Sequence, residues 1–200
     1  MLWLVLTVFL WGLVHSLSAS HKAKELARQI LGPRLYRFYR LAYNIFAGIS
    51  FLPVLVVMFL VPDRTLYLVP LPWSTLMIGG ELLAAAALML AFRQTDVWDF
   101  IGLRQLGASD RSSRLTTSGL YHWIRHPLYS AGLAFIWLMP LMTVNILTIN
   151  IALTVYVIIG ATFEERKLRS IFGQEYFDYE SVTPMFIPFL KGNKSRREAS

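Results

Sequence analysis

The chain has 200 residues, of which 56% are hydrophobic and only 16% are charged. Soluble domains carry about 25% charged residues, so the composition excludes an ordinary water-soluble fold and indicates a membrane protein. The absence of cysteine excludes disulfides, a thiol nucleophile and a thiolate metal site. The net charge of +7 comes from basic residues that flank apolar runs. We therefore expect anionic lipid headgroups as partners, and no nucleic acid.

Apolar runs that could cross a bilayer, which takes about 20 residues, recur along the chain. Residues 2–17 form the first run, which is expected to be a retained helix because a signal peptide would begin with basic residues. The second run covers residues 42–61 and the third residues 71–92. Residues 128–163 are enough for two short spans, with a turn near Asn145. The sequence therefore predicts an all-α, polytopic membrane fold with about five transmembrane helices.

Basic residues alternate between rich and poor connecting segments. The segments after the first, third and fifth runs are rich in Lys and Arg, whereas the segment after the second contains only Arg64 and the turn near Asn145 contains none. The positive-inside rule then puts the N-terminus outside and the C-terminus in the cytoplasm. The polar segments that could hold a charged cofactor all fall on the cytoplasmic side.

The strongest local motif covers residues 115–129. Gly119 suits a backbone turn, and Pro127 suits the first turn of a helix. Arg125 and His126 therefore stand where a polar loop enters the membrane as a helix. The free N–H groups and the dipole of a helix N-terminus favour an anion, and a neighbouring arginine strengthens that preference. The segment suits a cofactor carboxylate, but it equally suits an arginine and a histidine that only reach lipid headgroups.

Two adjacent carboxylates, Glu164 and Glu165, end the last apolar run. At a membrane edge they need water or a partner, and they could accept hydrogen bonds from an ammonium group or ribose hydroxyls. Glu165 could instead pair with Arg169, one helical turn later. Residues 172–179 mix aromatics and carboxylates, which could cover an adenine or form an interfacial aromatic belt. Residues 193–200 are expected to be a disordered tail.

These motifs, taken in order, resemble the isoprenylcysteine carboxyl methyltransferase family, which is related to the phospholipid methyltransferases. The resemblance covers about residues 115–192 and rests on Thr117-Ser118-Gly119-Leu120-Tyr121, Arg125-His126-Pro127-Leu128-Tyr129, Glu164-Glu165, Phe172-Gly173-Gln174-Glu175-Tyr176 with Tyr179, and Pro188-Phe189-Leu190-Lys191-Gly192. Family members usually read His-Pro-x-Tyr-x-Gly, whereas Ala131 stands at the glycine position here and Gly132 follows. The first half is less specific. His15-Ser16 and residues 36–44 are similar to bacterial members of the methanethiol S-methyltransferase type.

The resemblance implies a membrane methyltransferase that uses S-adenosylmethionine. It implies one domain over residues 1–200, with a catalytic half at about residues 93–192, in a bacterial or archaeal inner membrane. The implied cofactor pocket is formed by the loop before the fourth helix, the end of the fifth helix and the C-terminal segment. Its implied residues are Tyr121, Arg125, His126, Pro127, Tyr129, Gly132, Glu164, Glu165 and Tyr176. Arg125, Glu164 and Glu165 are also expected to serve catalysis.

The expected methyl acceptor is lipophilic or small: an isoprenylcysteine-like carboxylate, a thiol or an amine. Four histidines without paired helical spacing make a metal site unexpected. Two other functions stay open. One is an NADPH-dependent membrane reductase of the sterol-reductase type, whose C-terminal architecture is related. The other is a membrane transport or scaffold protein without enzymatic activity.

Overall fold

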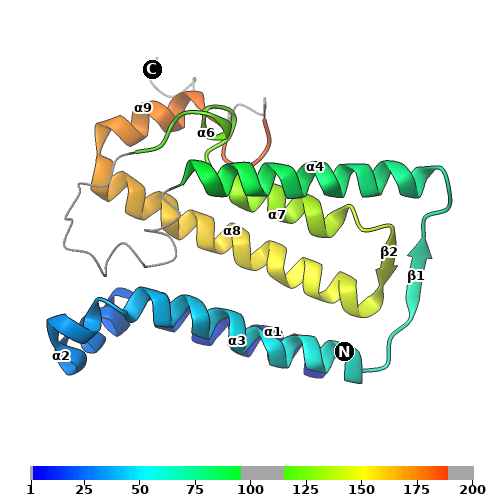
Figure 1. The fold of residues 1–200 in the computed structure, drawn as a ribbon, viewed down its shortest axis with the longest axis horizontal. Helices are drawn as coiled ribbons and strands as arrows, with labels where there is room; N and C mark the ends of the chain where they lie inside the picture. Colours follow the sequence, from blue (N-terminus) through cyan, green and yellow to red (C-terminus); the bar gives the residue numbers. More distant parts are fainter. Residues whose placement is uncertain (1, 96–114, 189–200) are drawn as a thin grey trace, which may run out of the picture. The chain divides into compact units, whose positions relative to one another are not determined.

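The computed structural model describes residues 2–95 and 115–188. These residues are mostly helical (Figure 1). The elements, in chain order, are α1 (Leu2–Ala19), α2 (His21–Tyr36), α3 (Tyr39–Leu60), β1 (Thr65–Leu68), α4 (Trp73–Gln94), α6 (Leu120–Trp123), α7 (Pro127–Trp137), β2 (Leu141–Thr143), α8 (Val144–Phe172) and α9 (Gln174–Val182). The predicted all-α membrane fold is confirmed, with one addition: β1 and β2 pair as a short antiparallel ladder.

Four of the described helices, α1, α3, α4 and α8, are long and apolar enough to cross a membrane. The predicted pair of short spans within residues 128–163 is divided differently. It consists of α7, with 11 residues, and α8, with 29. At 1.5 Å per residue, α7 is only about 16 Å long, roughly half of the hydrocarbon thickness. It ends early because the chain bends at Leu138 and continues into β2, which pairs with β1.

The turn expected near Asn145 lies earlier, in the segment that contains β2. Asn145 itself belongs to the first turn of α8 and is fully buried. Its Nδ2 donates to the backbone oxygens of Met58 and Val61, both at 3.1 Å. These carbonyls belong to the last turn of α3 and the residue after it, where helical partners are missing. Asn145 therefore caps α3 across a long loop.

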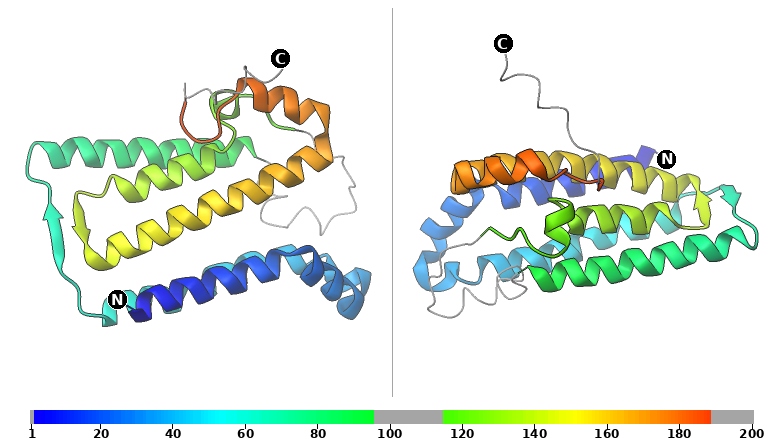
Figure 2. Two further views of the ribbon diagram at one scale, coloured as in Figure 1. Left: turned by 180° about the vertical axis from the view of Figure 1, so that it is seen from behind. Right: turned by 90° about the horizontal axis from the view of Figure 1, so that it is seen from above.

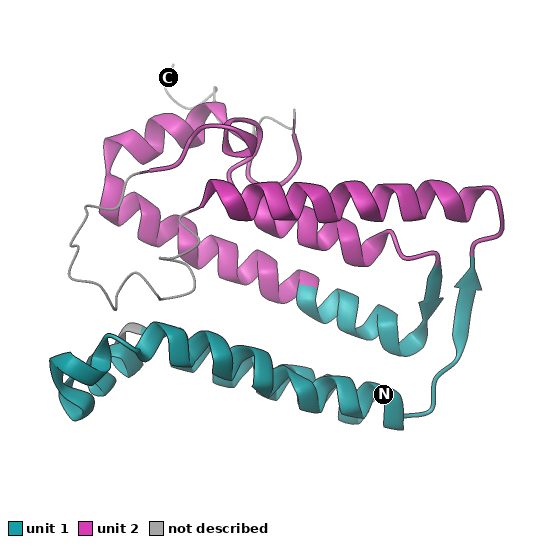
Figure 3. Cartoon of the chain, viewed as in Figure 1, with its two compact units in different colours: residues 1–68, 96–112, 141–153 teal, residues 69–95, 113–140, 154–200 magenta. Residues whose placement is uncertain are grey.

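The chain divides into two compact units, coloured separately in Figure 3. Of the described elements, the first unit contains α1, α2, α3, β1, β2 and the start of α8. Its apolar core joins Leu4, Val8, Val54 and Ile149. Next to this core, His15 Nε2 lies 2.6 Å from the hydroxyl of Tyr43. The His15-Ser16 motif thus contacts α3 within this unit.

The second unit contains α4, α6, α7, the remainder of α8, and α9. Here α4 and α7 lie side by side in both views of Figure 2, with small residues such as Ala84 and Ala131 buried. A side chain at Gly80 would come within 2.9 Å of Leu138, so the glycine allows the close approach. Gly119 adopts a left-handed φ of 64° at the start of α6, as the turn prediction required.

Candidate active site

Arg125 and His126 lie in the second unit, in the short link between α6 and α7. The Arg125 N–H donates to the Pro184 oxygen at 2.9 Å, and the His126 N–H donates to the Met185 oxygen at 3.1 Å. Both acceptors follow α9. The C-terminal segment therefore holds the Arg-His pair in place just before Pro127 begins α7.

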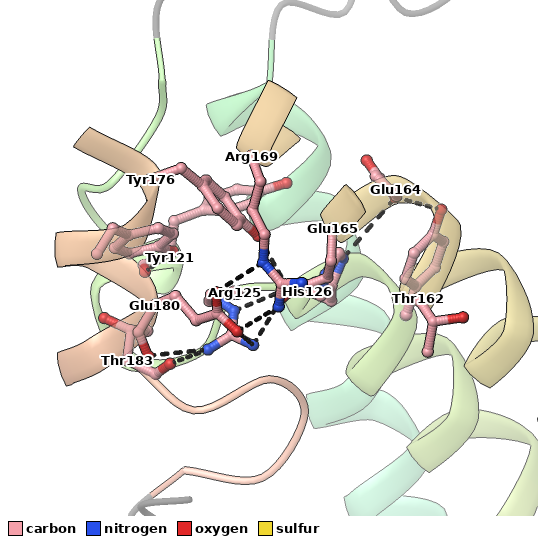
Figure 4. Close-up of polar contacts among 12 residues, drawn as sticks. Tyr121, Arg125, His126, Thr162, Glu164, Glu165, Arg169, Tyr176, Glu180 and Thr183 are labelled. Carbon is pink, nitrogen blue, oxygen red and sulfur yellow. Dashed lines mark hydrogen bonds and ion pairs between the residues drawn. The ribbon is translucent and has the colours of Figure 1, made fainter. Parts of the chain in front are cut away.

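Glu165, near the end of α8, is the centre of the polar cluster and is only 3% exposed. Arg125 donates to both of its oxygens, from Nε at 2.8 Å and from Nη2 at 2.9 Å (Figure 4). His126 Nε2 lies 2.9 Å from Oε1, and the Tyr176 hydroxyl donates to the same oxygen at 2.8 Å. A buried carboxylate is stable only when it is paired and hydrogen-bonded, and Glu165 fulfils both conditions.

A second ion pair extends this cluster toward α9. Arg169 donates to Glu180 through Nε at 2.8 Å and through Nη2 at 2.5 Å. Its distance to Glu165 is longer, 3.7 Å, so the helical-turn pairing expected for these two residues is the weaker contact. Arg125 Nη1 also donates to the backbone oxygens of Glu180 and Thr183. Two arginines and two glutamates thus alternate and join the residues before α7 to α8 and α9.

Glu164 points away from this buried cluster, and its side chain is 44% exposed. It accepts a hydrogen bond from the Tyr129 hydroxyl at 2.9 Å. His126 Nδ1 lies 3.8 Å from its Oε2, and the rings of His126 and Tyr129 stack with centroids 5.4 Å apart. Because a carboxylate only accepts, the contact with Glu165 puts a proton on His126 Nε2, and in a neutral ring Nδ1 is then an acceptor. The open side of the site therefore presents the Glu164 carboxylate as an acceptor.

The tyrosines around the cluster are held in their protonated form. Burial raises the pKa of Tyr176, and its hydrogen bond to Glu165 raises it further. Burial also raises the pKa of Tyr121 to about 12, with a smaller contribution from the charge of Glu164. Burial likewise raises the pKa of Tyr179, whose hydroxyl donates to the backbone oxygen of Tyr121 at 2.5 Å. These phenols act as hydrogen-bond donors near neutral pH.

The structure brings together most of the residues singled out from the sequence: Arg125, His126, Tyr129, Glu164, Glu165 and Tyr176. Pro127 and Gly132 lie apart from these contacts. Pro127 lines an apolar hollow, and an added Cβ at Gly132 would make ordinary contact with Leu88 of α4. Sequence reasoning missed Glu180 and Thr183, and it assigned Arg169 only to Glu165. The acidic side chain of Glu180 was the one signal that could have indicated an ion pair. Its pairing with Arg169 depends on how α9 folds back onto α8.

Two hollows flank the cluster within the second unit. The apolar one has a volume of about 470 Å³, and its walls include Leu83, Ala87, Ile124, Ala131, Ala134 and Ile187. Ala131, which stands where family members usually have glycine, thus contributes its methyl group to the wall of the apolar hollow. The other hollow, of about 440 Å³, is lined by Thr117, His122, Asp178, Tyr179, Val182 and Thr183. Over residues 2–95 and 115–188, no group of three His, Asp or Glu side chains could hold a metal ion.

Residues 75–175 match the phospholipid methyltransferase family. A methanethiol S-methyltransferase of Pseudomonas deceptionensis is 30% identical over 202 residues, covering 97% of this chain and 75% of that protein. That of Crocosphaera subtropica is 35% identical over 103 residues, covering 49% of the chain and 40% of that protein. Human protein-S-isoprenylcysteine O-methyltransferase is 35% identical over 124 residues, covering 60% and 41%. The chain thus spans less than half of the last two relatives. No solved structure matches it.

Proposed function

The chain belongs to the phospholipid methyltransferase family, and from this premise we propose that it transfers a methyl group from S-adenosylmethionine to a lipophilic or small acceptor at the membrane. The observation that carries the proposal is the arrangement of the two adjacent glutamates. Glu165 is locked in a buried network, and Glu164 faces outward beside Tyr129 and His126 Nδ1. The buried network of Glu165 gives the site a rigid support, and the outward-facing acceptor groups beside it suit a cationic cofactor.

The chemistry of this face fits the cofactor's functional groups. Glu164 and His126 Nδ1 are acceptors, which suit an ammonium group or ribose hydroxyls. The stacked ring of Tyr129 presents a π face, which attracts a sulfonium cation. The first turn of α7 suits the cofactor's carboxylate, because backbone N–H groups at a helix N-terminus lack helical acceptors. Tyr121 would contribute to the same wall.

Arg125 and Glu165 are better suited to positioning than to touching the cofactor. Arg125 already donates to Glu165, Glu180 and Thr183, and its side chain is only 9% exposed. Tyr176 also donates to Glu165. We propose that these three residues fix His126 and the start of α7, because precise placement supplies much of the rate in a displacement reaction.

When bound, S-adenosylmethionine supplies an electrophilic methyl group on a positively charged sulfur. The charge of Glu164 and the ring of Tyr129 would stabilise positive charge at this face. The apolar hollow beside Pro127 and Ala131 would hold the acceptor's hydrocarbon part and exclude water. A thiolate or carboxylate acceptor needs no base, whereas an amine must lose a proton. For an amine, His126 Nδ1 is the candidate proton acceptor.

The proposed orientation puts the N-terminus outside and the C-terminus in the cytoplasm of a bacterial or archaeal inner membrane. It follows from the alternation of basic segments, of which residues 96–114 and 189–200 lie outside the described residues. In this orientation the cluster around Glu165 opens toward cytoplasmic S-adenosylmethionine. The proposed single domain with a catalytic half at about residues 93–192 likewise extends beyond the described residues.

A labelled-methyl transfer screen tests the proposed function. Membranes that contain the protein receive S-adenosylmethionine labelled in its methyl group, together with small thiols, a prenylcysteine, amines or phospholipids. We expect label in one acceptor class and a loss of at least about ten-fold in Glu164→Gln, which keeps the shape but removes the charge. Glu175→Gln, an acidic-to-amide change in the first turn of α9, is the matched control and should keep full transfer. No transfer to any acceptor class would overturn the proposal.

A further inference from the structure

α2 is a polar helix inserted between two spanning-length helices of the first unit. It has 16 residues and begins after the cap residue Ser20, whose hydroxyl accepts from the Ala23 N–H at 3.2 Å. A kink interrupts it at Gly32, where φ is 66°, next to Pro33. Because α1 ends at Ala19 and α3 begins at Tyr39, both ends of α2 are tied to helices that can cross the membrane.

The part of α2 before the kink has two chemically distinct faces. Successive residues are rotated by about 100° around a helix axis. On that basis one continuous arc, about 140° wide, carries only apolar side chains. It contains Ala23, Leu26, Ala27, Ile30 and Leu31. The rest of the circumference is polar and contains Lys22, Lys24, Glu25, Arg28 and Gln29.

The apolar arc is only partly covered by the rest of the described chain. Ala23 and Ala27 are half-buried, whereas Leu26 is 57% and Ile30 is 73% exposed. Beyond the kink, Leu35 is also 57% exposed. Two large aliphatic side chains on adjacent turns, flanked by cations, are typical of a helix that lies in a membrane interface.

We propose that α2 is an interfacial helix that binds anionic phospholipid headgroups. Leu26 and Ile30 insert at the boundary between headgroups and acyl chains, while Lys22 and Arg28 contact lipid phosphates. The helix carries four Lys or Arg side chains and one Glu, giving it a net charge of +3 that is complementary to an anionic leaflet. This assignment is independent of the proposed methyl transfer, because no residue of α2 belongs to the cluster around Glu165.

The depth of α2 can be measured directly, because the chain has no cysteine to compete for a label. A nitroxide is attached to Ile30→Cys on the apolar arc and, as the control, to Glu25→Cys on the polar face. In vesicles of phosphatidylglycerol and phosphatidylcholine, the Ile30 label should collide with dissolved oxygen and be shielded from a water-soluble nickel complex. The Glu25 label should show the opposite. Equal access of the nickel complex to both labels would overturn the proposal and indicate that this face contacts water or another protein.

Lipid selection is tested in the same vesicles. A donor dye on Ile30→Cys reports energy transfer to acceptor-labelled phosphatidylglycerol or to acceptor-labelled phosphatidylcholine. We expect preferential transfer to the anionic lipid, falling by up to about five-fold for each cation removed in Lys22→Gln/Arg28→Gln. It should also weaken at high salt. Arg64→Gln, which removes one cation beyond the other end of α3, is the control and should keep the preference. Equal energy transfer to both lipids in the unchanged helix would overturn the proposal. Methyltransferase activity is measured separately, by labelled-methyl transfer in the same vesicles.

Discussion

At the scale of single residues, Glu164 and Glu165 are neighbours with different environments. Because adjacent residues of a helix point about 100° apart, one side chain turns into the cluster while the other faces outward. Glu165 is 3% exposed and contacts Arg125, His126 and Tyr176. The Glu164 side chain is 44% exposed, accepts a hydrogen bond from the Tyr129 hydroxyl and lies 3.8 Å from His126 Nδ1. We therefore propose that Glu165 serves positioning and that Glu164 contacts the ligand.

This difference predicts opposite effects of two matched substitutions. Glu165→Gln removes the charge opposite a buried arginine, which should cost about 3 kcal/mol of stability. Glu164→Gln is solvent-exposed and should change stability by less than about 0.5 kcal/mol, but it should weaken S-adenosylmethionine binding about ten-fold. Thermal unfolding in detergent and ligand titration give the two readouts. Equal destabilisation by both changes would contradict the assignment.

The residues of the candidate site were largely accessible to sequence reasoning, but their contacts with one another were not. The Arg-His-Pro segment, the glutamate pair and Tyr176 were singled out from their motifs, and the structure brings them together. Which glutamate turns inward depends on the rotation of α8 against α9, a tertiary property that no local pattern carries. The resemblance implied that Arg125 contacts the cofactor, and that role stays a prediction. Its contacts with the backbone oxygens of Glu180 and Thr183 leave no sequence signal.

At the scale of elements, α9 is held against α8 by the salt bridge between Arg169 and Glu180, which adjoins the buried carboxylate of Glu165. Gly173, with φ of 54°, lets the chain reverse between the two helices. Arg169 and Glu180 then join them through two short contacts, while Arg125 reaches the backbone of the same turn of α9. The placement of α9 therefore couples the end of α8 to the start of α7.

A double-mutant cycle measures the coupling energy of the Arg169–Glu180 ion pair. Arg169→Gln and Glu180→Gln should each lower stability by about 1 kcal/mol, and the double variant should lose less than the sum. The single variants should also raise KM for S-adenosylmethionine more than they lower kcat, because the pocket wall is loosened rather than the reacting groups removed. Strict additivity of the two losses would show that the residues do not act as a pair.

Asp63 fixes the junction of α3, the strand pair and α8 in the first unit. Burial alone would raise the pKa of its carboxyl group. Hydrogen bonds from the Thr143 side chain and from the backbone N–H groups of Asn145 and Arg64 outweigh that effect and lower the pKa. A depressed folded-state pKa stabilises the protein above the unfolded value near 4, and that contribution is lost as the pH falls further.

The stability difference between the wild type and Asp63→Asn should therefore be constant at neutral pH and shrink below about pH 4. Thermal unfolding in detergent between pH 7 and pH 3 measures it. A difference that stays constant through pH 3, or that grows as the pH falls, would contradict the assigned role of the carboxylate.

Element lengths were the least predictable part of the fold. The long apolar runs indicated α1, α3 and α4 correctly, because about 20 apolar residues suffice to identify a spanning helix. The run at residues 128–163 gave no sign that β2 would pair with β1 and shorten α7, since strand pairing depends on a partner far along the chain. The segment after α1 was used only for its charge, and its amphipathic helix was missed.

At the scale of the whole molecule, composition predicted a polytopic membrane protein, and the ordered motifs predicted its family. Those motifs come together in one polar cluster formed by the residues before α7, by α8 and by α9, so their order along the sequence carries information that hydropathy lacks. The acceptor is not encoded in these motifs. Relatives in the same family are named for methanethiol and for isoprenylcysteine.

The orientation in the membrane is testable with single cysteines. A membrane-impermeant maleimide should label Arg64→Cys in intact cells, because the segment after the second apolar run is expected outside. Ser200→Cys, at the C-terminal residue, should react only after the cells are permeabilised. The reverse pattern would establish the opposite orientation.

The central claim is that the cluster around Glu165 supports a site for S-adenosylmethionine rather than for a nicotinamide cofactor. Isothermal titration of the purified protein in lipid nanodiscs tests it directly, with S-adenosylmethionine and NADPH offered in separate experiments. We predict saturable binding of S-adenosylmethionine, weakened about ten-fold by Glu164→Gln and unaffected by Glu175→Gln, with no saturable binding of NADPH. Saturable NADPH binding without any binding of S-adenosylmethionine would contradict the account and favour a membrane reductase.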